Sequence, residues 1–148
     1  MPGCSGSSCS AWRNAAAESY CVDALLTTAQ QSSAALLGNA ASTAKPVYIS
    51  NAAMGGQFDV SNLLITANAL TLGAVAKVGT TWTSGTARAC LNGGAVASAA
   101  NLTTGYSAIA TFQLGGDSAA NEHLNGYVRR LRYWPQALTA AQLAQVTT

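Results

Sequence analysis

The stretch "LNGYVRRLRYWPQALTAAQLAQVTT", residues 124–148, carries the strongest local signals of the fold. Its first half places three arginines, two tyrosines and a tryptophan in a chain with only 8% charged residues. These residues raise the question of whether the segment is a nucleic-acid site or the closing strand of a fold. Its second half follows Pro135, and Thr139 is a suitable N-cap for a short helix at residues 139–146.

Side-chain alternation gives the arginine-rich segment two different faces if it is a strand. Arg130, Arg132 and Trp134 then share one face, whereas Leu131 and Tyr133 share the other and should point to the core. The three-residue face could bind phosphate or sugar. Alternatively, the arginine stems cover apolar surface or pair with acids across a subunit interface. We favour this second interpretation, because a net charge of +2 gives a weak field for nucleic acid.

The composition is typical of a single β domain that is rich in small residues. A chain of 148 residues fits one domain, and 49% of the residues are hydrophobic. Few charges and many small residues suit strands packed face to face better than solvated helices. We assign residues 1–14 to a Gly/Ser-rich arm and 15–148 to the domain. The sequence contains neither an apolar run near 18 residues nor a signal peptide at residues 1–20, so we expect no membrane association.

Short apolar runs bounded by Gly, Asn, Ser or Pro fill the chain from about residue 18. Such spacing predicts the strands of an antiparallel β-sandwich or barrel. The clearest turn lies in "ARACLNGGAVAS", residues 87–98. Asn and Gly tolerate the positive φ of a tight turn, so this segment predicts a hairpin centred on residues 92–94.

The polar residues give little support for catalysis, and we expect a non-enzymatic protein. Glycoside hydrolysis generally needs two carboxylates that flank one bond, and no motif pairs the five acids. The chain also lacks the nucleophile-elbow, phosphate-loop and zinc-protease motifs. A polysaccharide hydrolase remains an alternative that single substitutions of the acids would test. We expect His123 to be a surface residue of the polar segment at residues 115–126.

Metal binding is also a minor alternative. Asp117 and Glu122 lie in the same polar segment and could offer oxygen ligands to calcium. We favour a solvated polar loop, so we expect no cofactor and keep calcium as the alternative. The four cysteines lack zinc-site spacing and should be reduced thiols, although a disulfide between Cys4 and Cys9 stays open.

Aromatic side chains offer a different kind of site, because their apolar faces can stack on sugar rings. We expect these residues to lie mainly in the core or in an interface. The candidates for glycan binding are Trp82, Tyr106 and Trp134.

The last sixty residues, taken in order, resemble the C-terminal half of a laminin-G-like, concanavalin-A-like jelly-roll domain. The resemblance is greatest to the version found in virion proteins of tailed bacteriophages. The matching elements are Leu114-Gly115, Asn125-Gly126, the arginines of residues 129–132, Tyr133-Trp134, Pro135, and the span from Leu138 to Leu143. It implies two antiparallel sheets packed face to face, with the arginine-rich segment as the final strand. Many relatives bind glycans, often with calcium.

The resemblance favours a non-enzymatic virion protein, most simply a decoration or cement subunit on the capsid surface, assembled in the bacterial cytoplasm. Its partners would be the major capsid protein or other virion proteins, and we expect a homo-oligomer, with a trimer favoured. The alternative is a tail-associated receptor- or glycan-binding module. We expect the interface to use Trp12, Arg13, Arg129, Arg130, Arg132 and Trp134.

Overall fold

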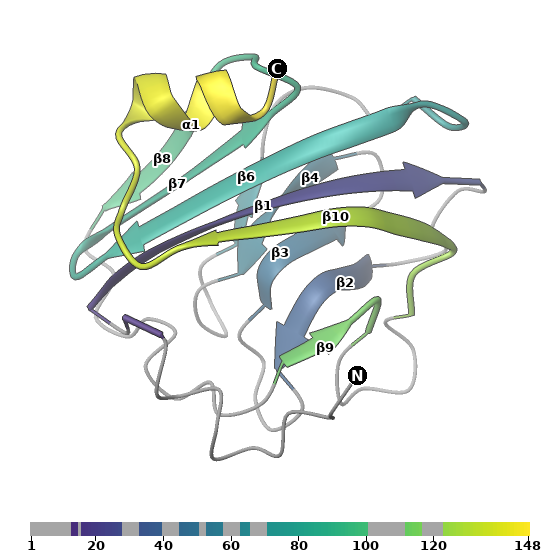
Figure 1. The fold of residues 1–148 in the computed structure, drawn as a ribbon, viewed down its shortest axis with the longest axis horizontal. Coiled ribbons are helices and arrows are strands. Elements are labelled where there is room, and N and C mark those ends of the chain that lie inside the picture. Colours follow the sequence, from purple (N-terminus) through teal and green to yellow (C-terminus); the bar gives the residue numbers. More distant parts are fainter. Residues whose placement is uncertain are drawn as a thin grey trace.

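Two five-stranded antiparallel sheets pack face to face in the computed structural model (Figure 1). The structure describes residues 13–14, 16–27, 33–39, 45–50, 53–57, 63–65, 71–100, 112–116 and 123–148. This architecture confirms the predicted β-sandwich. Across these ranges, no helix has the length and apolarity needed to span a bilayer.

The first sheet joins the beginning and the end of the chain. Its strand order is β10-β1-β6-β7-β8, with every neighbouring pair antiparallel. Its strands are β1 (Ala17–Leu26), β6 (Val75–Thr83), β7 (Thr86–Leu91), β8 (Ala97–Ala100) and β10 (Gly126–Trp134). The arginine-rich segment is therefore the last strand, and it lies at one edge of the first sheet beside β1.

The second sheet is built from the middle of the chain. Its order is β5-β4-β3-β2-β9, again with antiparallel neighbours. Its strands are β2 (Ser33–Asn39), β3 (Lys45–Ser50), β4 (Ala53–Gln57), β5 (Leu63–Ile65) and β9 (Phe112–Leu114).

The core lies between the two sheets because alternate residues of their strands are apolar. From β1, Tyr20, Val22 and Ala24 point inward and are almost fully buried. They meet side chains of the second sheet, among them Leu36 and Ile49. Burying each large apolar side chain contributes about 1.5–3 kcal/mol, so this cluster is the main source of stability.

The outer face of the first sheet, which is turned away from the second sheet, carries a short helix. Helix α1 (Ala140–Val146) is capped by Thr139, which accepts a bond from the Gln142 N–H. The Gln142 side chain bonds in turn to the Thr139 N–H, which completes a capping box. The predicted helix is confirmed. Leu143 is buried against Cys90 and Leu138 in a second, smaller core on this face.

The predicted hairpin is also confirmed. Asn92 and Gly93 have φ values of 50° and 67°, and the Gly94 N–H donates to the Leu91 carbonyl oxygen over 2.9 Å. These features define a tight turn between β7 and β8. Asn92 also exchanges hydrogen bonds with the backbone of Lys77, so the turn is fixed to β6.

Candidate functional site

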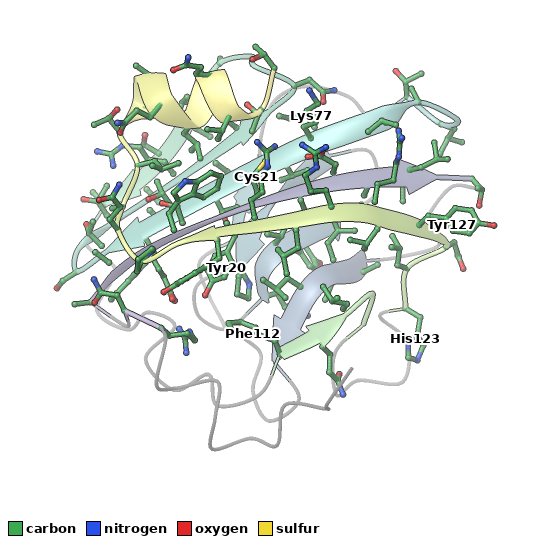
Figure 2. All side chains as sticks on the ribbon, viewed as in Figure 1. Tyr20, Cys21, Lys77, Phe112, His123 and Tyr127 are labelled. Carbon is green, nitrogen blue, oxygen red and sulfur yellow. The ribbon has the colours of Figure 1, made fainter. Side chains whose placement is uncertain are left out.

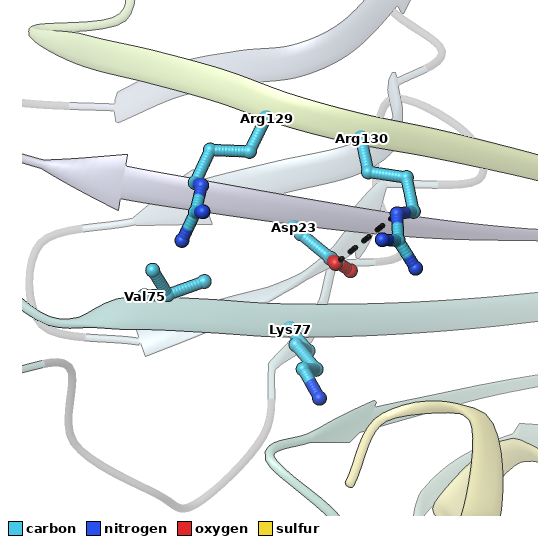
Figure 3. A pocket seen from close by; sticks show the side chains of 5 residues that line it. All are labelled: Asp23, Val75, Lys77, Arg129 and Arg130. Atoms are coloured by element: carbon cyan, nitrogen blue, oxygen red, sulfur yellow. Dashed lines mark ion pairs between the residues drawn. The ribbon is translucent and has the colours of Figure 1, made fainter.

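A β-bulge in β10 brings two arginines to the same side of the first sheet. Asp23 pairs with Arg130 and Ala24 pairs with Val128, so Arg129 has no partner residue in β1. An extra residue of this kind breaks the alternation of side chains and re-aims its neighbours. Arg129 and Arg130 consequently both project over the outer face of β1 toward β6 (Figure 3).

An open pocket of about 340 Å³ lies beneath these arginines. Three adjacent strands line it, through Asp23 of β1, Val75 and Lys77 of β6, and Arg129 and Arg130 of β10 (Figure 3). The register explains this convergence, because Asp23 lies opposite both Lys77 and Arg130. This pocket, named the basic pocket below, is shallow and polar, with Val75 as its apolar side chain.

Positive charge dominates the surroundings of the basic pocket. Asp23 lies between two arginines, with Oδ1 3.2 Å from Arg132 Nη2 and Oδ2 3.9 Å from Arg130 Nε. Lys77 and Arg129 complete the group, which makes four positive side chains around one carboxylate. This excess of positive side chains within a few strands attracts anions more strongly than the low overall charge of the chain suggests.

Two of the four cations are held by the fold itself. Arg132 donates to the Val146 carbonyl oxygen over 2.8 Å, and its guanidinium lies 5.8 Å from the Trp134 ring centroid. The Lys77 ammonium donates to the Thr148 carbonyl oxygen. Both side chains therefore fasten the end of helix α1 to the sheet.

The other two cations are available to a ligand. Among the residues that the structure describes, Arg129 has no ion-pair or hydrogen-bond partner. The Arg130 side chain is 64% exposed, and its 3.9 Å contact with Asp23 is longer than a hydrogen bond. The two guanidinium groups thus present unused N–H donors at the mouth of the basic pocket.

The residues next to the basic pocket are buried under helix α1 and offer no reactive side chain. Cys21, Gly79 and Cys90 form one row across β1, β6 and β7, beneath helix α1. Burial raises the pKa of the Cys21 thiol to about 11, although Arg132 beside it acts in the opposite direction. The thiol therefore stays protonated at neutral pH and is a poor nucleophile.

The two acids in the described ranges lie on opposite faces of β1. Glu18 points inward and is fully buried beside Arg13, whose Nε lies 3.2 Å from Glu18 Oε2. Asp23 is five positions further along the strand and points outward. Side chains on opposite faces of one strand cannot flank the same glycosidic bond, so these two carboxylates form no hydrolytic pair.

Several residues singled out from the sequence lie away from the basic pocket. Trp82 is 6% exposed and belongs to the core between the sheets. The Arg13 side chain is 3% exposed in its pair with Glu18. Trp134 is partly buried against the small core under helix α1. Trp12, Tyr106, Asp117 and Glu122 lie outside the described residues.

The predicted faces of β10 are largely as expected. Arg130, Arg132 and Trp134 share the outer face, and Tyr133 packs against the core. Leu131 points to the same side as Tyr133 but remains 40% exposed, because β10 is an edge strand. His123 is exposed, as predicted.

Three residues in or beside the basic pocket were not predicted from the sequence, namely Asp23, Lys77 and Tyr127. Tyr127, near the start of β10, is 65% exposed (Figure 2). It pairs with Leu25, which pairs in turn with Val75, so the three residues form one cross-strand row. The position of Tyr127 two residues before Arg129 was a usable signal of a shared face. Asp23 and Lys77 were invisible as pocket residues, because only the strand order brings them beside β10.

The sequence matches a known protein family. A laminin-G-type family model, described as the concanavalin A-like lectin/glucanases superfamily, matches residues 4–144. The chain belongs to this superfamily. A search of curated proteins gives no significant match.

Solved structures of this superfamily's fold match the chain at low sequence identity. The CBM40 module of a Ruminococcus gnavus IT-sialidase is 18% identical with a TM-score of 0.68, over 90% of this chain and 84% of that one. Domain 4 of a Geobacillus stearothermophilus arabinanase, solved with arabinotriose, is 16% identical with a TM-score of 0.69, over 93% and 69%. These likenesses establish the fold alone.

Parts of larger solved proteins have the same fold. A proposed carbohydrate-binding protein from Bacteroides ovatus is 16% identical with a TM-score of 0.70. The match covers 88% of this chain but 40% of that protein, so this chain spans less than half of its length. A Trypanosoma rangeli sialidase matches over 88% of this chain and 22% of its own length, with 14% identity and a TM-score of 0.67.

Proposed function

We propose that this chain is a non-catalytic carbohydrate-binding module and that the basic pocket is its saccharide site. The observation that carries the proposal is the basic pocket itself, where unused arginine donors, a carboxylate and apolar surface meet on three strands. A CBM40 module and an arabinanase domain with this fold accompany sugar-processing enzymes, which supports the same assignment.

The chemistry of the basic pocket suits a ligand with several hydroxyl groups. Asp23 Oδ1 accepts from Arg132, but in the part of the chain that the structure describes no donor lies within hydrogen-bond distance of Oδ2. A sugar hydroxyl can donate to Oδ2 while a ring oxygen or second hydroxyl accepts from Arg130. Val75 and Tyr127 supply apolar surface for the C–H face of the ring.

The size of the basic pocket also agrees with a short saccharide. A volume of about 340 Å³ is near the lower end of ligand pockets, which run from about 300 to 1,000 Å³. Such a space accommodates one or two sugar units rather than a long chain. We therefore expect weak monovalent binding that several copies of the module would strengthen.

A glycan microarray probed with an oligomeric fusion of the whole chain tests this proposal. Val75→Trp would fill the basic pocket without changing a charge, and Thr83→Trp provides the same change at the far end of β6. We expect Thr83→Trp to keep the array signal and Val75→Trp to lose it. A folded wild-type protein that binds no glycan, or a Val75→Trp protein that binds normally, would refute the assignment.

As a second candidate function, we propose that the chain is a structural subunit of a phage particle, as the sequence resemblance suggests. The observation that favours it is the edge position of β10, where Leu131 is 40% exposed, together with the 61% exposed Leu114. Exposed apolar residues at a sheet edge suit contact with another subunit. In this reading Arg129 and Arg130 contact the major capsid protein or another virion protein, within a trimer or other homo-oligomer.

Immunogold electron microscopy of purified phage particles separates the two locations. Gold over the head supports a capsid decoration subunit, and gold at the tail supports a tail-associated glycan-binding module. Arg129→Ala with Arg130→Ala should lower occupancy of the particle while the isolated protein stays folded. Arg132 is unsuitable for this test, because it holds the end of helix α1.

A further inference from the structure

We infer that the ligand of the basic pocket is a saccharide with a single carboxylate, and that Arg129 is the residue that selects it. This inference rests on the proposed function. It adds the charge class of the sugar and names one specificity-determining residue. The carboxylate could belong to a uronic acid or to a sialic acid, and both present the same planar anion.

The first support is the imbalance of charge. Asp23 neutralises one positive charge, and both of its close ion-pair contacts go to Arg130 and Arg132. Lys77 is engaged by a main-chain oxygen of Thr148. Arg129 has no partner of either kind in the described ranges. A neutral sugar would leave its charge uncompensated, whereas a carboxylate would pair with it.

The second support is the direction of the Arg129 side chain. In a regular strand only one of residues 129 and 130 would face outward. The bulge turns both over the basic pocket, on either side of Asp23 (Figure 3). A guanidinium group binds a carboxylate through two parallel N–H donors, so a bound carboxylate would lie under Arg129 on the Val75 side of the basic pocket.

The third support concerns the number of negative charges on the ligand. Asp23 lies at the centre of the basic pocket and repels any anion that approaches it. A phosphate or a densely sulfated chain would place two or more charges near that carboxylate. A sugar acid avoids this cost, because its carboxylate can bind Arg129 while its hydroxyls donate to Asp23.

Matched pairs of ligands test the inference by isothermal titration calorimetry with the whole chain. One pair is galacturonate, which has a single carboxylate, and its methyl ester, which replaces that negative charge by a methyl ester group. The other pair is sialyllactose and its methyl ester, and comparison of the two acids distinguishes a sialic acid from a uronic acid. We expect at least one acid to bind about tenfold or more tightly than its neutral counterpart, which is the scale of one charge-assisted hydrogen-bonded contact.

Two arginine variants locate the effect. Arg129→Gln should bring the affinity for the acid down to that for the neutral partner and leave the neutral affinity unchanged. Arg88→Gln is the matched control, because Arg88 lies on the outer face of the same sheet, in the row of Ser19 and Thr81 and outside the basic pocket. It should change neither affinity.

The outcomes separate this inference from the proposed function. Equal affinity for acid and ester overturns the carboxylate assignment but leaves a saccharide site in place. Preference for dextran sulfate over both acids also overturns it, because a dense anion would then be the ligand. Absence of binding to any saccharide removes the proposed function as well. An acid preference that Arg129→Gln leaves intact would show that another residue selects the charge.

Discussion

Gly79 lies directly beneath Leu143, so closely that a Cβ atom at residue 79 would come 2.7 Å from Leu143 Cδ1. The same Cβ would lie 2.8 Å from Thr147 Cγ2. Helix α1 can therefore reach the outer face of the first sheet only because residue 79 has no side chain. The end of this helix in turn receives the hydrogen bonds from Arg132 and Lys77 beside the basic pocket.

Gly79→Ala should destabilise the protein, although alanine is normally favoured over glycine in a strand by about 0.5–1 kcal/mol. Overpacking against Leu143 and Thr147 should outweigh that gain and cost about 1–3 kcal/mol of unfolding free energy. Urea unfolding measures this loss. Leu143→Ala creates space, so adding Gly79→Ala to it should cost less than in the wild type. Additive effects in this double-mutant cycle would contradict the packing account.

Thr139→Ala should remove the side-chain cap of helix α1. The Thr139 hydroxyl accepts from the Gln142 N–H over 3.3 Å, and loss of such a cap costs about 1 kcal/mol. Thermal unfolding followed by circular dichroism would show the change. Gln145→Ala, at an exposed position of the same helix, should leave stability nearly unaltered. Equal melting temperatures for the Thr139 variant and the wild type would mean that the cap contributes nothing.

The buried pair of Arg13 and Glu18 should be costly to break from one side. Glu18→Gln would remove the carboxylate that the Arg13 guanidinium contacts in a site that is almost closed to solvent, at a cost of about 3–5 kcal/mol. Replacing both residues, as in Arg13→Met with Glu18→Leu, should recover much of that loss. Chemical denaturation of the three proteins checks this order. A single variant as stable as the wild type would show that the pair contributes nothing to the fold.

Stability should fall between about pH 9 and about pH 11, partly because of Cys21. Burial raises the pKa of this thiol from 9.0 to about 11. Over that interval the unfolded chain loses the thiol proton and the folded chain keeps it. The unfolded state then binds fewer protons, so the unfolding free energy decreases as the pH rises. Cys21→Ala should show a shallower decrease in urea unfolding, and an unchanged slope would contradict this assignment.

Local chemistry made part of this fold predictable from the sequence. Asn92 and Gly93 favour positive φ, and Thr139 can cap a helix, so both the turn and the helix were identified from a few neighbouring residues. The final strand was also predicted, because the alternation of Arg130, Leu131 and Arg132 needs no knowledge of its partners. Each of these features depends on residues that are close in sequence.

The basic pocket required information that no short segment contains. Regular alternation places Arg129 on the face opposite Arg130, and only the register between β10 and β1 reveals the bulge that reverses it. Asp23 pairs with Arg130 across 107 residues of sequence and with Lys77 across 54, and both pairings depend on strand order. Trp82, a candidate for stacking on a sugar ring, lies inside the core, where most of the aromatic side chains were expected.

The most direct test of the saccharide site is a titration of the isotopically labelled chain with galacturonate and with sialyllactose, followed by amide chemical shifts. We predict that the ligand which binds perturbs the amides of Asp23, Val75, Lys77, Arg129 and Arg130, with smaller changes along β7 and β8. Perturbations confined to strands of the second sheet, with these five amides unchanged at saturation, would contradict this prediction and place the ligand on the other side of the sandwich.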